Sequence, residues 1–250
     1  MKIYVINLDR NPERLAHMRE QLSDVGFERV AAVDGSLNPE TTKGLTRFEL
    51  ACLASHRNAW GLFLKGEEPH ACFLEDDVHL SRDFDALLGG GAWIPPDSHS
   101  VKLDTYFQEV KLGPRHTVFG SREAARLYTR HESSAAYVLS REGARRYLEL
   151  TAHPILPADY SLFPRSPRSL GLRVYQLTPA VAIQDHLLQP CGGAAFPTAM
   201  GAGGAVRPSK PLPGKLGREI KRLIDQLAEI REAIYLRASV NAETTTVGFG

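Results

Sequence analysis

The fold of this chain is decided by residues 3–35, IYVINLDRNPERLAHMREQLSDVGFERVAAVDG. The stretch opens with an apolar run over 3–8 that polar residues bound, which is typical of an interior strand. A helix start follows at 11–13, with asparagine as N-cap, proline at the first helical position and an acid in the first turn. Gly26 ends this helix, and a second strand is expected over 27–33. The order strand-helix-strand predicts a parallel pair and an α/β sheet.

The composition of the chain is that of an ordinary globular protein. Of its 250 residues, 43% are hydrophobic and 24% are charged, so a wholly disordered or fibrous chain is excluded. The formal net charge is +1, which lacks the basic excess of a nucleic-acid binder, and no nucleic-acid partner is expected. The 3 cysteines form neither a disulfide framework nor a paired metal motif. No apolar run reaches the roughly 18 residues of a membrane span, and we expect a cytoplasmic protein.

Further along the chain, local signals mark the remaining elements. Thr46 and Glu49 form a capping box before a long helix that should reach about Leu64. An apolar strand over 71–74 ends directly in three acidic residues. Other strands are expected over 101–103, 135–139, 174–177 and 180–183, and other helices over 83–88 and 141–150.

Composition changes after residue 189, and the change predicts the domain boundaries. One α/β domain is expected over 1–189, followed by a Gly/Pro-rich loop or linker over 190–214. Leucines and isoleucines at heptad spacing then predict an amphipathic helix over 215–239, and 240–250 is expected to be a frayed tail. This helix either docks on its own domain, forms a weak homodimer, or makes peripheral contact with the inner membrane surface.

The acidic triplet Glu75-Asp76-Asp77 is the sharpest local signal for a functional site. It stands at the carboxyl end of an apolar strand, where open α/β sheets bind their ligands. Residues two apart in an extended chain point the same way, so Glu75 and Asp77 can share one hard cation while Asp76 faces elsewhere. Mg²⁺ or Mn²⁺ bridging a diphosphate would offset the repulsion between these carboxylates. The alternative is a solvated acidic turn or a helix cap.

Several residues near predicted strand ends are further candidates. Arg10 and Arg14 follow the first strand, where a guanidinium can pair with phosphate. Asp34 ends the second strand and can accept from a ribose or base, or form a turn. His56 lies within the long predicted helix, where it either contacts a ligand or packs as a structural residue.

Two late residues have chemistry that suits catalysis. Asp159 lies in an apolar, proline-rich stretch, where partial desolvation favours a general base, although a helix cap is the other reading. His186 follows the last predicted strand, where it is either a third metal ligand or a structural histidine.

The order of these motifs resembles glycosyltransferase family 25, which contains bacterial lipooligosaccharide and collagen galactosyltransferases. The resemblance spans about residues 2 to 186 and is carried by Val5-Ile6-Asn7-Leu8-Asp9-Arg10 with Arg14, Ala32-Val33-Asp34-Gly35, Leu53-Ala54-Ser55-His56 with Trp60, Phe73-Leu74-Glu75-Asp76-Asp77, Val101-Lys102-Leu103, Ala135-Ala136-Tyr137-Val138-Leu139-Ser140 with Gly143-Ala144, and Pro157-Ala158-Asp159.

The resemblance implies a GT-A type α/β fold with a mostly parallel central sheet, a nucleotide-sugar donor and inverting transfer. The acidic triplet would stand for the family's DXD motif, with Glu75 and Asp77 as metal ligands. By analogy with GT-A enzymes, Asp159 would activate the acceptor hydroxyl and His186 would be the late metal-binding histidine. The predicted donor-binding residues are Asn7, Leu8, Asp9, Arg10, Arg14, Asp34, His56, Asp76 and Lys102.

We therefore expect a glycosyltransferase that moves a hexose, galactose in most relatives, from a UDP-sugar to a saccharide or lipid-linked saccharide in lipooligosaccharide or surface polysaccharide synthesis. The cofactor would be Mn²⁺ or Mg²⁺. Two alternatives remain: a metal-dependent phosphohydrolase or nucleotidyltransferase that uses the same acidic cluster, and a catalytically silent sugar-binding protein.

Overall fold

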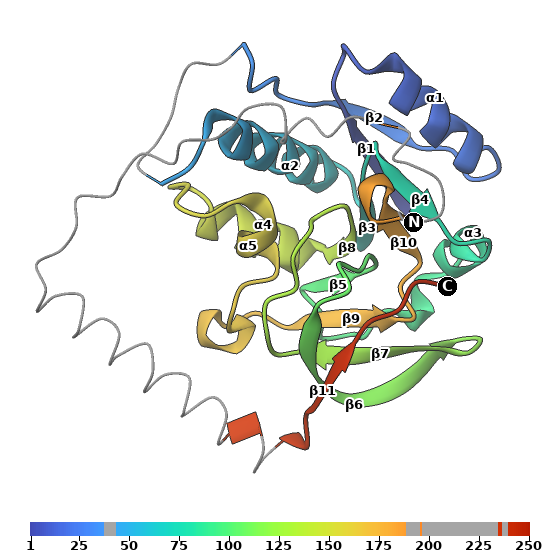
Figure 1. Ribbon diagram of the computed structural model, residues 1–250, viewed down its shortest axis with the longest axis vertical. Coiled ribbons are helices and arrows are strands. Elements are labelled where there is room, and N and C mark those ends of the chain that lie inside the picture. The colour runs from blue at the N-terminus through green and yellow to red at the C-terminus, as the bar shows by residue number, and fades with distance from the viewer. Residues whose placement is uncertain (38–43, 189–195, 197–234, 237–239) are drawn as a thin grey trace, which may run out of the picture.

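The computed structural model describes residues 1–37, 44–188, 196, 235–236 and 240–250. In this part of the chain a nine-stranded sheet has the strand order β11-β6-β7-β9-β5-β8-β3-β1-β2, and a two-stranded sheet pairs β10 with β4. Helices cover both faces of the large sheet (Figure 1). None of the helices described is long and apolar enough to cross a membrane.

The elements have the following bounds. The strands are β1 (Lys2–Asn7), β2 (Glu28–Ala31), β3 (His70–Glu75), β4 (Val78–Leu80), β5 (Ser100–Lys102), β6 (Glu109–Phe119), β7 (Arg122–Leu127), β8 (Ala136–Ser140), β9 (Val174–Thr178), β10 (Ala182–Gln184) and β11 (Glu243–Thr246). The helices are α1 (Pro12–Gln21), α2 (Arg47–Lys65), α3 (Phe84–Leu88), α4 (Arg141–Leu150) and α5 (Ala158–Leu162), with short 3₁₀ turns at Gly91–Trp93, Pro167–Leu170 and Asp185–Leu187.

The predicted strand-helix-strand opening is confirmed, since β1 pairs in parallel with β2 and with β3. The whole sheet is mixed rather than mostly parallel. Strand β8 runs antiparallel to both of its neighbours, β3 and β5, while β5 and β9 are parallel. The antiparallel β8 brings its N-terminal end to the edge where β1 and β3 end, and this edge carries the candidate site.

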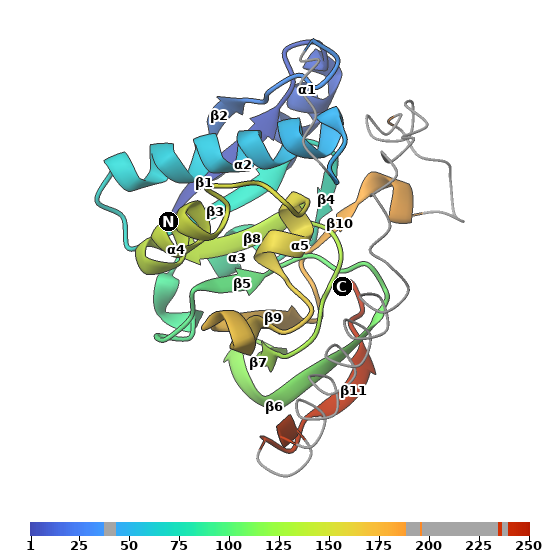
Figure 2. The ribbon, with the colours of Figure 1, turned by 90° about the vertical axis from the view of Figure 1, so that its left-hand side faces the viewer.

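The sheet separates two hydrophobic cores because successive side chains of a strand point to opposite faces. On β1, Tyr4 belongs to the core under α2, α4 and α5, whereas Val5 belongs to the core under α1 and α3. On β3, Phe73 and Leu74 divide in the same way. Figure 2 shows α2, α4 and α5 together on one face of the sheet.

Helix α2 begins as the capping box predicts. The Thr46 side chain accepts from the backbone N–H of Glu49, and the Glu49 carboxylate accepts from the backbone N–H of Thr46. Its buried face includes Trp60 and Phe63, and burying such a side chain contributes about 1.5–3 kcal/mol. This packing holds the middle of α2 over the ends of β1 and β3.

Two regions differ from the predictions. The hairpin of β6 and β7 was not predicted, and residues 240–250 are not a frayed tail. Strand β11 pairs antiparallel with β6, and Val247 beside it is fully buried. The predicted linker over 190–214 and heptad helix over 215–239 lie outside the described residues, apart from Phe196, Tyr235 and Leu236.

Candidate functional site

The acidic triplet forms the link between β3 and β4. Glu75 is the last residue of β3, and Asp76 and Asp77 make the turn that leads into β4. Because β1 is parallel to β3 and pairs Ile6 with Glu75, the carboxyl ends of both strands meet here. The structure thus places the triplet at the sheet edge where α/β proteins bind ligands.

Asp76 is held by two donors that come from β1 and α1. It accepts from Asn7 Nδ2 at 2.7 Å and from Arg14 Nη1 at 2.9 Å. Burial raises the pKa of Asp76, and these two donors offset only part of that effect. The hydrogen bonds from Asn7 and Arg14 therefore hold the side chain of Asp76, and with it the turn, against β1 and α1.

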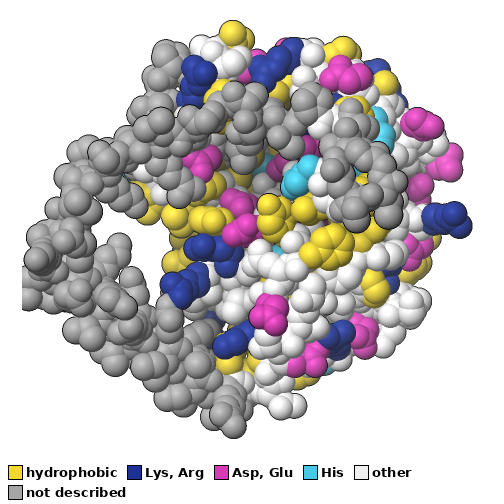
Figure 3. All heavy atoms as spheres, viewed as in Figure 1, with side chains coloured by type: hydrophobic (Ala, Val, Ile, Leu, Met, Phe, Trp, Pro, Cys, Tyr) yellow, Lys and Arg dark blue, Asp and Glu magenta, His cyan; other side chains and the backbone are white. Residues whose placement is uncertain are grey.

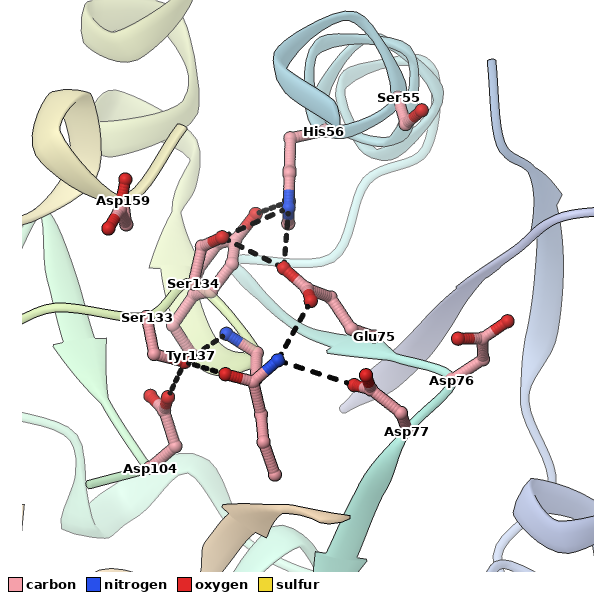
Figure 4. A network of polar contacts seen from close by, with 12 residues as sticks. Ser55, His56, Glu75, Asp76, Asp77, Asp104, Ser133, Ser134, Tyr137 and Asp159 are labelled. Carbon is pink, nitrogen blue, oxygen red and sulfur yellow. Dashed lines mark hydrogen bonds and ion pairs between the residues drawn. The ribbon is translucent and has the colours of Figure 1, made fainter. Parts of the chain in front are cut away.

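Glu75 points in another direction, toward α2 and β8. Its Oε1 lies 3.2 Å from His56 Nε2 and accepts from Ser134 Oγ at 2.8 Å, while His56 Nδ1 lies 2.7 Å from the Tyr137 hydroxyl (Figure 4). Burial opposes the charged form of Glu75, but the contacts with His56 and Ser134 outweigh it and hold its pKa below the usual value. Glu75 is therefore an anion at the base of the site.

Asp77 faces the same gap as Glu75. Gln184 Nε2 lies 3.4 Å from Glu75 Oε2 and 3.4 Å from Asp77 Oδ1, so one amide group bridges the two carboxylates. Burial and the neighbouring charge of Glu75 raise the pKa of Asp77 to about 7. In Figure 4, Asp76 points away from this gap, as the two-residue spacing predicts.

The side chains around this gap fit a hard divalent cation. Two carboxylates converge on it. His186, near the end of β10, lines the same cleft, and its buried Nδ1 has no hydrogen-bond partner in the described structure. Carboxylate oxygens suit Mg²⁺ and Mn²⁺. A positive ion there would relieve the repulsion that raises the pKa of Asp77.

A second set of donor atoms lies deeper in the site. The donor atoms of Cys52, His56 and Glu75 lie within 4.8 Å of one another. Burial raises the pKa of the Cys52 thiol well above its ordinary value, so the sulfur stays protonated. A neutral thiol is a poor ligand for a hard cation, which favours the gap between Glu75 and Asp77.

A cleft of about 450 Å³ lies over these groups. Apolar side chains such as Leu8, Val33 and Phe48 contribute to its wall, beside the acidic turn. Figure 3 shows acidic and histidine side chains next to hydrophobic ones across the middle of this face. The cleft is lined by eight of the residues that the sequence singles out, namely Leu8, Arg10, His56, Glu75, Asp76, Asp77, Asp159 and His186.

Five predicted donor-binding residues do not line the cleft. Asn7 and Arg14 lie behind Asp76, and Asp34 forms an ion pair with Arg10 beside the cleft. Asp9 is mostly exposed and pairs with Arg29. Lys102 is fully buried and pairs with Asp104 at 2.7 Å. The prediction that Lys102 contacts donor is corrected, because β5 ends inside the protein and not at its surface.

Asp159 stands across the cleft from the turn, in the first turn of α5 (Figure 4). It is half-buried, and burial raises its pKa. Its Oδ1 accepts from the backbone N–H of Tyr160 at 2.9 Å, which fixes the carboxylate. A carboxylate with a raised pKa at the wall of a cleft is suited to accept a proton from a hydroxyl group.

Three side chains that help to build the site, those of Ser133, Ser134 and Gln184, were not predicted. Ser133 and Ser134 precede β8, and because β8 runs antiparallel to β3, Ser134 reaches Glu75 and Ser133 reaches Gln184. Gln184 comes from β10, which pairs with β4 next to the turn. A sequence signal exists only for Gln184, which stands two residues before His186.

With this geometry in place, comparison with known proteins identifies the family. The model of glycosyltransferase family 25 (LPS biosynthesis protein) matches residues 1–162, and the chain belongs to this family. It is therefore a glycosyltransferase.

Three similar curated proteins come from Neisseria and Haemophilus. The Neisseria meningitidis lacto-N-neotetraose biosynthesis glycosyltransferase LgtE is 29% identical over 208 residues, which cover 74% of each chain. The Neisseria gonorrhoeae lacto-N-neotetraose biosynthesis glycosyltransferase LgtB is 27% identical and covers 74% of this chain and 75% of that protein. The Haemophilus influenzae lipooligosaccharide biosynthesis protein lex-1 is 28% identical and covers 59% of this chain and 53% of that protein.

Solved structures are more distant. A glycosyltransferase involved in the glycosylation of the major capsid of PBCV-1 has a TM-score of 0.41 and 11% identity, and the match covers 78% of this chain and 97% of that chain.

Proposed function

We propose that this enzyme transfers a hexose, galactose, from a UDP-sugar to a saccharide acceptor during lipooligosaccharide or surface polysaccharide assembly. The transfer inverts the anomeric carbon and depends on Mn²⁺ or Mg²⁺. The observation that carries the proposal is that Glu75, Asp77, His186 and Asp159 line one cleft. The names of the relatives LgtE, LgtB and lex-1, which refer to lacto-N-neotetraose and lipooligosaccharide biosynthesis, support the type of product, and the family resemblance supports UDP-galactose as donor.

The donor is expected to lie along the end of β1. The apolar wall that includes Leu8 and Phe48 suits the flat face of a nucleobase, and the exposed Arg10 suits a phosphate. Asp34, which pairs with Arg10, lies where a carboxylate can accept from a ribose hydroxyl. Asp76 shapes the turn beneath the diphosphate, with Asn7 and Arg14 as its supports.

Glu75, Asp77 and His186 are proposed to hold the divalent cation. When bound, such a cation supplies positive charge that stabilises the diphosphate as it leaves. His56 acts on this site through Glu75, since its ring contacts the carboxylate on one side and Tyr137 on the other. The rigid contact with Tyr137 keeps Glu75 in place.

Asp159 is proposed to be the general base. An inverting displacement needs the acceptor hydroxyl on the face of the sugar opposite the leaving group. Asp159 lies on α5, across the cleft from the acidic turn, which is the arrangement that this geometry requires (Figure 4). Its carboxylate takes the hydroxyl proton as the hydroxyl oxygen bonds to the anomeric carbon and the bond from that carbon to the diphosphate breaks.

A panel of nucleotide sugars with and without Mn²⁺ tests the proposal. We expect UDP-galactose to be consumed only with a divalent cation, and Asp159→Asn to lower kcat by about 10²–10⁴-fold, the usual contribution of a general base. The control is Asp83→Asn, outside the cleft. Release of free phosphate from simple esters without sugar transfer would contradict the proposal, as would sugar binding without turnover for the wild type.

A further inference from the structure

Gln184 joins the acidic turn to a buried polar network. Its Nε2 lies between the carboxylates of Glu75 and Asp77, and its Oε1 lies 3.0 Å from Ser133 Oγ. An amide carries two donors at one end and an acceptor at the other, and turning it over exchanges them. Which end faces the carboxylates therefore depends on the hydrogen-bond needs of Ser133.

The hydroxyl of Ser133 has only one proton to donate. Its Oγ lies 2.5 Å from Asp104 Oδ2 and accepts from the backbone N–H of Ala135 at 3.2 Å. A carboxylate only accepts, so the short contact with Asp104 takes the hydroxyl proton. The Ser133 oxygen therefore presents only a lone pair to Gln184, and a hydrogen bond to a lone pair requires a donor from Gln184.

Lys102 keeps Asp104 in the accepting state. The ammonium group is fully buried and donates to Asp104 Oδ1 at 2.7 Å and to the Ser133 carbonyl oxygen at 2.5 Å. A buried ammonium requires an ionised partner. Its second bond also holds Ser133 at φ 74°, a left-handed conformation that serine rarely adopts. Lys102 thus fixes both the position of Ser133 and the direction of its hydroxyl.

These requirements conflict at Gln184. When Gln184 Nε2 faces the carboxylates, Gln184 Oε1 faces Ser133 Oγ, whose proton is already donated to Asp104. With the amide turned over, Nε2 donates to Ser133, and Oε1 lies between two carboxylates. The second arrangement is favourable when a positive ion lies between Glu75 and Asp77, or below about pH 7, where the Asp77 carboxyl carries a proton that it can donate to Oε1.

We propose that Gln184 supplies a ligand oxygen, Oε1, to the divalent cation held by Glu75 and Asp77, and that Lys102, Asp104 and Ser133 are positioning residues that orient the amide for this purpose. An amide oxygen is a hard ligand of the kind that Mg²⁺ and Mn²⁺ accept. The inference rests on the metal dependence given under Proposed function and adds a ligand and its support to that site.

The opposite role for Gln184 would be a competitor of the cation. In that case its NH₂ group donates to both carboxylates and must be displaced before a cation enters. The two roles predict opposite changes on removal of the amide. Loss of a ligand weakens cation binding, whereas loss of a competitor tightens it.

Calorimetric titration of the full chain with Mn²⁺ alone, without nucleotide sugar, distinguishes them. We expect Gln184→Leu to weaken Mn²⁺ binding at least about 10-fold, the lower end of what lost ligand support costs. Gln184→Glu keeps an oxygen at this place and should bind Mn²⁺ at least as tightly as wild type. Ser133→Ala removes the acceptor for Nε2 and should weaken Mn²⁺ binding several-fold.

Gln108→Leu is the matched control, because Gln108 has both ends of its amide bonded to backbone and does not touch the carboxylates. It should leave the Kd for Mn²⁺ unchanged. The electron paramagnetic resonance spectrum of bound Mn²⁺ gives a second readout, which should change in Gln184→Leu and not in Gln108→Leu.

The outcomes separate this inference from the proposed function. Wild type that binds no Mn²⁺ would overturn both. Wild type that binds Mn²⁺, with Gln184→Leu binding equally or more tightly, would overturn only the role of Gln184. Thermal unfolding in EDTA checks that each variant is folded, and if Gln184→Leu is not, an unchanged Kd in Ser133→Ala overturns the proposal.

Discussion

Two buried arginines of this protein contact carboxylates in different ways. Arg122 on β7 binds Asp83 with two hydrogen bonds, of 2.8 and 2.6 Å, so one guanidinium matches one carboxylate. Arg14 on α1 faces two carboxylates with one Nη1, at 2.9 Å from Asp76 and 3.4 Å from Asp77. The first is the fork geometry of a strong ion pair, and the second leaves negative charge in excess.

The pKa values show the consequence of this difference. The hydrogen bonds from Arg122 lower the pKa of Asp83 to about 2. Burial and the charge of Glu75 raise the pKa of Asp77 to about 7, although Arg14 acts in the opposite direction. A matched pair stabilises the fold by itself, whereas the excess charge at the turn is balanced by a proton on Asp77 or by a bound cation. Such a contrast is what separates a structural pair from a functional site.

The largest expected effect comes from Asp77→Asn. Transfer should fall by up to about 10³-fold, because a group that supports charge stabilisation of the leaving diphosphate is lost. The folded protein should not be destabilised. The raised pKa means that ionisation of Asp77 costs stability as pH rises from about 4 through 7, so the variant should gain stability over wild type across this range.

Activity assays and urea unfolding at several pH values measure both effects. Asp83→Asn is the control for activity, since Asp83 lies outside the cleft and should not affect transfer. An Asp77→Asn enzyme with wild-type turnover would break the proposed distinction between the two carboxylates.

Removal of Arg14 should give the next largest effect. Arg14→Met leaves Asp76 and Asp77 buried without their cation, and breaking a buried pair from one side costs about 3 kcal/mol or more. Urea unfolding at pH 7.5 measures the loss. Mn²⁺ should restore part of it in this variant, because a divalent ion offsets the same charges, and no recovery with Mn²⁺ would contradict the excess-charge interpretation.

Metal binding itself should stabilise the protein by a smaller amount. A ligand that binds only the folded state adds about 2.7 kcal/mol at a concentration of 100 times its Kd. Mn²⁺ should therefore raise the Tm, and EDTA should reverse the rise. The same addition should leave the Tm of an Asp77→Asn variant nearly unchanged, and an equal rise in both proteins would place the ion elsewhere.

The smallest effect concerns Asp83. Its pKa of about 2 in the folded protein lies below the ordinary value of 3.8, so its contribution is present above about pH 4 and is lost as pH falls to about 2. The Asp83 side chain is 43% exposed, so solvent screening limits the contribution to about 1 kcal/mol. Unfolding of Asp83→Asn and wild type should differ at pH 6 and converge near pH 2, and a constant difference would contradict this pairing.

Elements with strong local signals could be predicted from the sequence. The capping box at Thr46 and Glu49, the apolar run that becomes β3 and the acidic turn all depend on neighbours in the chain. The β6–β7 hairpin could not be predicted because residues 114–117 of β6 are exposed and interrupt its hydrophobic pattern, and β7 carries three charged residues among six. Strand β11 was missed because its pairing with β6 joins residues far apart in the chain.

In the candidate site, too, some residues could be predicted from the sequence and others are placed only by the tertiary structure. Residue type and spacing predicted the acidic turn, Asp159 and His186 as site residues, and the structure places all of them in the lining of one cleft. Whether a predicted side chain can reach a ligand depends on its burial, which the sequence does not show. Lys102 looks like a phosphate ligand in the sequence, yet the sheet encloses it and it pairs with Asp104.

The sequence by itself therefore determined the strand-helix-strand opening, the long capped helix and the family to which the chain belongs. Each of these depends on patterns of residues that are close together along the chain. Only the tertiary structure decided which charges are matched and which are left in excess. That decision depends on the direction of β8 and on the pairing of β10 with β4, which bring Ser134 and Gln184 to the turn. Electrostatic energy depends on distance and burial in space, and separation along the chain does not report either one.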